Sequence, residues 1–151
     1  MAISVTIETT IAREPDEVFA ALTDLEGWPT WLIATGIRSV QRAEGGPLTV
    51  GERVTVDQSA AGRSSTVEAT IAALEPGARF LIEGRDGDGV STSLEAVLAR
   101  VEEGTRLRWS ARIELPLRLR VFEGLARPSV ERAAALDVEA FRRRLESSPT
   151  A

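Results

Sequence analysis

Alternation of apolar and polar residues runs through most of this sequence and predicts β-strands. Residues 3–11 have the sequence ISVTIETTI, and this period of two is typical of a strand with one buried face. Turn signals that contain glycine then divide residues 37–115 into further alternating segments, because glycine supplies the positive φ that tight turns need. We therefore expect six more strands, at about 37–43, 50–58, 64–74, 78–85, 90–102 and 105–115.

Apolar residues at helical spacing predict two short helices between the first two strands. Pro15, Asp16 and Glu17 are typical of a helix start, because proline fits the first turn and acidic residues favour the positive end of the helix dipole. This helix is expected to end near Asp24. The segment 28–32, WPTWL, predicts a second short helix or a tight turn.

The tail from about residue 119 to residue 147 predicts a long helix. Its apolar positions keep roughly helical spacing at Phe122, Leu125, Ala133, Leu136, Ala140, Phe141 and Leu145. Pro128 either kinks this helix or begins its main part. We prefer one helix that is kinked near Pro128.

The strand at 105–115 has the clearest two-faced pattern. Leu107, Trp109, Ala111 and Ile113 share one face, whereas arginine, serine and glutamate occupy the other. One apolar face and one polar face are typical of antiparallel sheets that are solvated on one side. The same alternation assigns further residues to the apolar face: Val54, Val56, Val67, Ala69, Ile71, Phe80, Ile82, Leu94, Ala96 and Leu98.

Composition limits the partners of this chain. Its 151 residues, 43% of them hydrophobic, suit a single domain over residues 1–151. The net charge of −5 argues against nucleic acid as a partner, because an acidic domain repels a phosphate backbone. We expect no membrane span, because no apolar run reaches about 18 residues. The first ten residues lack the layout of a signal peptide, so a cytoplasmic location is expected.

The missing residue types limit catalysis. The chain contains no Cys, His, Lys, Tyr or Asn, which excludes thiol nucleophiles, Schiff-base lysines and Ser-His-Asp triads. Any catalysis would depend on carboxylate, hydroxyl, arginine or bound water. We expect no metal site and no cofactor, and the sequence identifies no catalytic residue.

Four segments resemble the polyketide cyclase/dehydrase group of the START-like (SRPBCC, Bet v 1-like) superfamily. Residues 15–24 (PDEVFAALTD) resemble its opening helix, and residues 27–32 (GWPTWL) its second helix. Residues 48–54 (LTVGERV) are similar to its third-strand entry, and the end of the tail to its closing helix. The resemblance covers nearly the whole chain, is specific for the fold and is weak for function.

This resemblance implies an α+β helix-grip fold, in which seven antiparallel strands curve around the last helix and leave a cavity. Members bind lipids, steroids, hormones or polyketides, and a minority catalyse cyclisation or dehydration. We therefore expect a small hydrophobic, lipid- or polyketide-like ligand. The candidate ligand-binding residues are Trp31, Val54, Val56, Gln58, Ile71, Phe80, Ile82, Leu94, Leu98, Leu107, Trp109, Ala111, Ile113, Phe122 and Leu125.

Two alternative functions stay open. A cyclase or dehydratase would need a carboxylate or arginine inside the cavity. Arg112 would supply one only if its strand shifted by one residue. An interaction module without a ligand would instead need a large exposed apolar patch.

Several other motifs have simpler interpretations. Trp28 and Trp31 could stack on a ligand at the cavity mouth, but anchoring the short helices to the sheet is the favoured role. The sequence DGDG at 86–89 resembles part of a calcium loop but lacks the other ligands, so a hairpin turn is expected. The three arginines at 142–144 are expected to be a solvated helix end.

Overall fold

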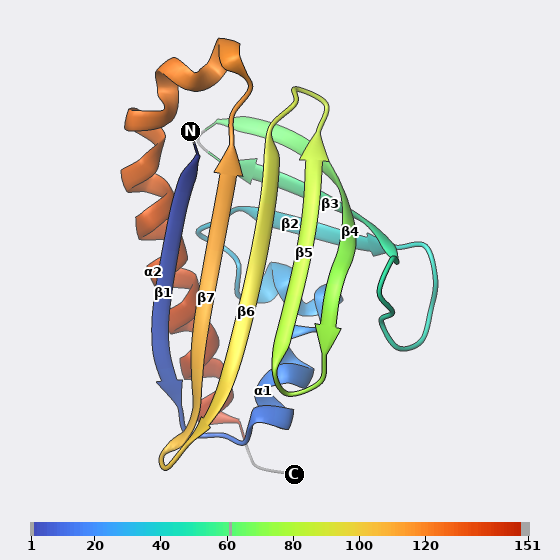
Figure 1. Ribbon diagram of the computed structural model, residues 1–151, viewed down its shortest axis with the longest axis vertical. Helices are drawn as coiled ribbons and strands as arrows, with labels where there is room; N and C mark the ends of the chain where they lie inside the picture. The colour runs from blue at the N-terminus through green and yellow to red at the C-terminus, as the bar shows by residue number, and fades with distance from the viewer. Residues whose placement is uncertain (1, 61, 149–151) are drawn as a thin grey trace.

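The computed structural model describes residues 2–60 and 62–148. It contains seven strands, two α-helices and two short 3₁₀-helices, η1 and η2 (Figure 1). In chain order they are β1 (Ile3–Ile11), α1 (Pro15–Leu22), η1 (Leu25–Thr30), β2 (Ile37–Arg42), β3 (Arg53–Ala60), β4 (Arg63–Glu75), β5 (Arg79–Asp86), β6 (Ser91–Val101), β7 (Gly104–Glu114), η2 (Leu117–Phe122) and α2 (Glu123–Ser147).

The seven strands form one antiparallel sheet that curves around α2. Their order is β1-β7-β6-β5-β4-β3-β2, so the first strand pairs with the last and each later strand pairs with its neighbour in the chain. Figure 1 shows α2 lying along β1 and β7 on one side of the sheet, with α1 near one end. The predicted helix-grip fold is therefore confirmed.

The register between strands keeps the predicted apolar face on the inside. Trp109 of β7 lies opposite Ile7 of β1 and Ala96 of β6, and Ala111 lies opposite Val5 and Leu94. Arg112 falls on the outer face, where it is exposed and bonds to Glu114. The shift of one residue that would bring Arg112 inside therefore does not occur.

Two boundaries differ from the prediction for local backbone reasons. The third strand begins at Arg53 instead of residue 50, because Gly51 has a φ of +92° and belongs to a turn. The tail is not one helix from residue 119, because η2 precedes α2. Pro128 lies inside α2 and does not begin it. None of the helices among residues 2–60 and 62–148 is long and apolar enough to cross a lipid bilayer.

The buried face of α2 is rotated relative to the predicted one. The C-terminal half of α2 buries Asp137, Val138 and Phe141, whereas Leu136 and Ala140 are exposed. The prediction for Leu136 and Ala140 was therefore wrong. It failed because Asp137, a polar residue that the sequence pattern assigns to solvent, occupies an interior position.

An aromatic cluster fills the part of the interior next to η1. Trp28 makes edge-to-face contacts with Trp31, Phe80 and Trp109, with ring centroids 6.1–6.4 Å apart. Its indole Nε1 donates to the carbonyl oxygen of Leu22, at 2.8 Å. Trp31 packs in turn on Phe141 of α2. These contacts anchor the short helices to the sheet, the role that the sequence favoured for both tryptophans.

A buried ion pair connects β2 to the start of β3. The Nε atom of Arg42 donates to Oε2 of Glu52 at 2.6 Å, and its Nη2 donates to Oε1 at 3.0 Å. This two-point hydrogen bond outweighs the effect of burial and lowers the pKa of Glu52 below its ordinary value. The ionised form of Glu52 is therefore the form that stabilises the fold.

Glu52 should make stability depend on pH in the acid range. A lowered pKa means that its contribution is complete above the pKa of an unfolded glutamate, about 4.3. The contribution is lost as the pH falls through the lower pKa of the folded state. We expect Glu52→Gln to reduce the free energy of unfolding near neutral pH and to approach the wild type in acid. Urea unfolding across the pH range would measure this, with the exposed Glu44→Gln as control. A constant difference at every pH would contradict it.

Candidate ligand-binding site

A cavity of about 650 Å³ lies between the inner face of the sheet and the first half of α2. The loop before β2, four strands, the last residue of η2 and α2 contribute to its wall. The lining residues are Leu32, Ala34, Thr35, Ile37, Gln58, Ser59, Thr92, Leu94, Trp109, Ala111, Ile113, Phe122, Leu125, Ala126, Ser129, Val130, Ala133 and Ala134. Its volume falls in the range of small-molecule sites, about 300–1,000 Å³.

The helix wall of this cavity is one continuous stripe. Its members occur at 122, 125–126, 129–130 and 133–134, the spacing of residues on one face of an α-helix. Alanine and serine make up four of the five lining residues of α2 after Leu125, and short side chains leave the space between helix and sheet unfilled. Further along α2, Val138 and Phe141 continue this side of the helix into the core.

On the sheet side, Trp109 forms the boundary between the cavity and the aromatic cluster. Its ring is part of the aromatic cluster and also lines the cavity. The interior is therefore divided: aromatic rings fill the part next to η1, and the part next to η2 is open. Phe122 and Leu125 line the cavity and are themselves exposed, so the cavity opens to solvent beside them.

The lining carries no formal charge among the described residues. Thirteen of the eighteen side chains are apolar, and the other five are hydroxyls or an amide: Thr35, Gln58, Ser59, Thr92 and Ser129. Gln58 Nε2 donates to the carbonyl oxygen of Thr35 at 3.1 Å, which holds that amide beside the cavity. Within residues 2–60 and 62–148, the hydroxyls of Thr92 and Ser129 make no hydrogen bond to protein, so both are available to a ligand.

The structure divides the fifteen sequence-predicted residues into two groups. Seven line the cavity: Gln58, Leu94, Trp109, Ala111, Ile113, Phe122 and Leu125. Eight are buried in the hydrophobic core: Trp31, Val54, Val56, Ile71, Phe80, Ile82, Leu98 and Leu107. Of these eight, Val56 and Ile82 line a void of only about 40 Å³ that shares four residues with the cavity wall. Trp31 lines a separate cleft of about 210 Å³ beside Arg144.

A buried carboxylate holds one edge of the cavity in place. Asp137 of α2 is 2% exposed and accepts hydrogen bonds from the backbone N–H groups of Ala34 and Thr35, at 2.9 and 2.8 Å. The Thr35 hydroxyl also donates to Asp137, at 2.6 Å. Ala34 and Thr35 both line the cavity, so this cluster fixes the loop before β2 against the helix.

Sequence reasoning missed this loop and the part of the α2 stripe that follows Leu125. The loop residues Leu32, Ala34 and Thr35 lie outside any alternating strand, so periodicity gives them no face. The α2 residues are small, and a core prediction favours large apolar side chains. The available signal was the set of small residues at positions 126, 129, 133 and 134, which one face of the helix brings together.

The fold and this site together define a helix-grip protein with an internal cavity. The comparisons with known proteins agree with this class. Residues 2–146 match the family model described as polyketide cyclase / dehydrase and lipid transport, so the chain belongs to that family. No curated protein matches the sequence.

Solved structures with the same fold span nearly the whole chain. A Thermus thermophilus protein superposes with a TM-score of 0.77 at 19% identity, over 96% of this chain and 99% of its own. An aromatase/cyclase from a Streptomyces strain superposes with a TM-score of 0.75 at 18% identity, over 97% and 94%. Ara h 8.0201 gives 0.68 at 19% identity, over 98% and 100%. At these identities the likeness shows the fold alone.

Proposed function

We propose that this protein binds a small, uncharged and mainly apolar molecule in the cavity between α2 and the sheet. The observation that carries the proposal is the charge-free lining of a 650 Å³ cavity. Removing apolar surface from water contributes about 25 cal/mol per Å² before the costs of association are subtracted. A molecule that fits this space therefore gains affinity from burial, without any ion pair.

The five polar lining side chains would set the ligand's orientation. Thr35, Gln58 and Ser59 belong to the loop before β2 and to β3, and Thr92 belongs to β6. A few placed hydrogen-bonding groups in an apolar wall are the usual means of fixing a ligand's pose. A neutral ligand with a hydroxyl or carbonyl group, such as a polyketide-like or lipid-like molecule, suits this combination.

Binding fits the cavity better than catalysis does. The cyclase alternative needs an acid, a base or an arginine against the substrate, and the described lining residues include none of these. Two buried carboxylates, Glu123 and Asp137, lie near lining residues in the chain, but neither is itself a lining residue. Asp137 is bonded to Ala34 and Thr35. The lining residues therefore do not support the cyclase activity that some members of the family have.

A matched pair of fluorescent probes would test the proposal. N-phenyl-naphthylamine and anilinonaphthalene sulfonate share one ring skeleton, but only the second carries a charge. We expect saturable binding of the neutral probe with a roughly micromolar Kd. The sulfonate should bind at least about tenfold more weakly, because burying an unpaired charge is costly. No saturable binding of the neutral probe, or a preference for the sulfonate, would overturn the proposal.

A further inference from the structure

Large apolar side chains project into solvent where the cavity opens. They belong to residues 117–125, which we call the mouth segment and which comprise η2 and the first turn of α2. The exposed fractions are 80% for Leu117, 77% for Val121, 53% for Phe122 and 77% for Leu125. Four such residues within nine positions form a patch of the kind that marks a contact surface, whereas isolated exposed apolar residues need no explanation.

The mouth segment also presents positive charge. Arg118 and Arg120 are exposed, and neither forms an ion pair with a carboxylate among the described residues. Their hydrogen bonds go to backbone oxygens: Arg118 Nη2 donates to Asp88 at 2.6 Å, and Arg120 Nε donates to Leu115 at 3.4 Å. The one acidic residue of the segment, Glu123, is buried. The surface of the segment is therefore both apolar and cationic.

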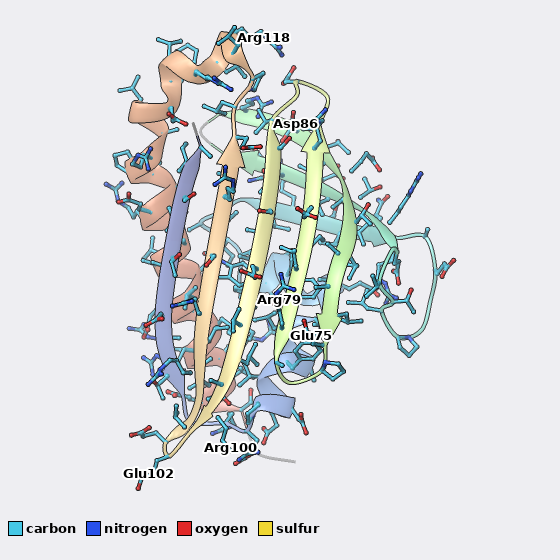
Figure 2. The ribbon with its side chains drawn as sticks, viewed as in Figure 1. Glu75, Arg79, Asp86, Arg100, Glu102 and Arg118 are labelled. Atoms are coloured by element: carbon cyan, nitrogen blue, oxygen red, sulfur yellow. The ribbon has the colours of Figure 1, made fainter. Side chains whose placement is uncertain are left out.

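Two exposed acidic residues beside the mouth segment, Asp88 and Glu114, are paired with other arginines. Figure 2 shows Arg118 at one end of the long axis and Glu102 at the opposite end. Asp88, which lies next to Arg118, is paired through its side chain with Arg63 at 2.5 Å. Glu114 is likewise paired with Arg112, at 3.0 Å. Within the described part of the chain, the arginines of the mouth segment thus form no ion pair, although the net charge of the chain is −5.

We propose that the mouth segment docks on the surface of an anionic lipid membrane, with the cavity opening toward the bilayer. Apolar side chains can enter the headgroup boundary while arginines contact lipid phosphates, as in interfacial helices. A second copy of the chain fits less well, because a two-fold contact through this segment would place arginines against arginines. An apolar ligand could then pass between membrane and cavity without crossing water.

Vesicle flotation tests this surface without any ligand. The full chain would be mixed with vesicles of phosphatidylcholine alone, or of phosphatidylcholine with about a third phosphatidylglycerol. We expect association with the anionic vesicles and little with the neutral ones. Binding should weaken as salt is raised, because exposed charges are screened.

Variants of residues outside the cavity lining separate docking from ligand binding. Arg118→Glu combined with Arg120→Glu, and separately Val121→Glu, should each reduce binding to anionic vesicles about tenfold or more. The matched controls are Arg106→Glu on the outer face of β7 and Val50→Glu in the loop before β3, both exposed. The controls should bind vesicles like the wild type.

Three results would overturn the docking proposal: equal binding to neutral and anionic vesicles, no binding to either, or no difference between mouth-segment and control variants. A dimer that Val121→Glu converts to a monomer would assign the patch to self-association instead. Titration of these variants with N-phenyl-naphthylamine in the absence of vesicles measures the cavity separately. A failure of docking is thereby distinguished from a failure of the proposed ligand binding.

Discussion

Replacing Ala133 by tryptophan should weaken binding of N-phenyl-naphthylamine at least tenfold while leaving the protein folded. Ala133 lines the cavity from α2, and an indole there would occupy space that the ligand needs. Because the ring would enter an existing cavity, the backbone does not have to move to accept it. We expect the free energy of unfolding to stay the same or to rise, since the ring buries apolar surface that water otherwise reaches.

Three successive alanines of α2 provide the controls for this experiment. Ala133 lines the cavity, Ala134 is buried against β1 and also contributes to the lining, and Ala135 is exposed. Ala135→Trp adds the same ring on the solvent side and should leave both probe binding and stability nearly unchanged. Probe titration and urea unfolding of the two tryptophan variants would be compared. Equal affinities for wild type and Ala133→Trp would mean that the probe binds elsewhere.

Replacing the buried Asp137 by alanine should lower the free energy of unfolding by about 3 kcal/mol. The substitution removes the acceptor for two backbone N–H groups and one hydroxyl. A buried donor without a hydrogen-bond partner carries an uncompensated desolvation penalty, which lowers the free energy of unfolding. Because Ala34 and Thr35 line the cavity, probe affinity should fall as well.

A graded series distinguishes this cluster from general helix effects. Thr35→Val removes only the hydroxyl donor and should cost about 1 kcal/mol. Glu131→Ala, at an exposed position of the same helix, should change stability by less than about 0.5 kcal/mol. Urea unfolding of all three variants gives the comparison. Asp137→Ala and Glu131→Ala with the same stability would contradict the assigned role of the cluster.

The sheet could be predicted because strand alternation is a local property of the sequence. Each of β4–β7 contains a stretch in which every second residue is apolar and is bounded by turn signals, so the existence of the strand and its inner face can be predicted. The α2 face was harder to predict. Binary patterning treats an aspartate as solvated, and Asp137 is an interior residue held by three hydrogen bonds.

The cavity could be predicted only in part, because alternation identifies inward residues without distinguishing a packed interior from an open one. Leu107 and Trp109 lie on the same face of β7, yet only Trp109 lines the cavity. The two residues differ in their tertiary surroundings. The aromatic cluster fills the interior next to η1, whereas small residues of α2 leave the other half of the interior open. The packing of α2 against the sheet therefore decides which inward residues line the cavity.

A crystal structure of the protein with N-phenyl-naphthylamine would test the central claim most directly. We predict electron density for the probe between α2 and the sheet, in contact with Trp109 and Ala133. Density confined to the cleft beside Trp31 and Arg144, or to the outer surface while the cavity between α2 and the sheet stays empty, would contradict the account.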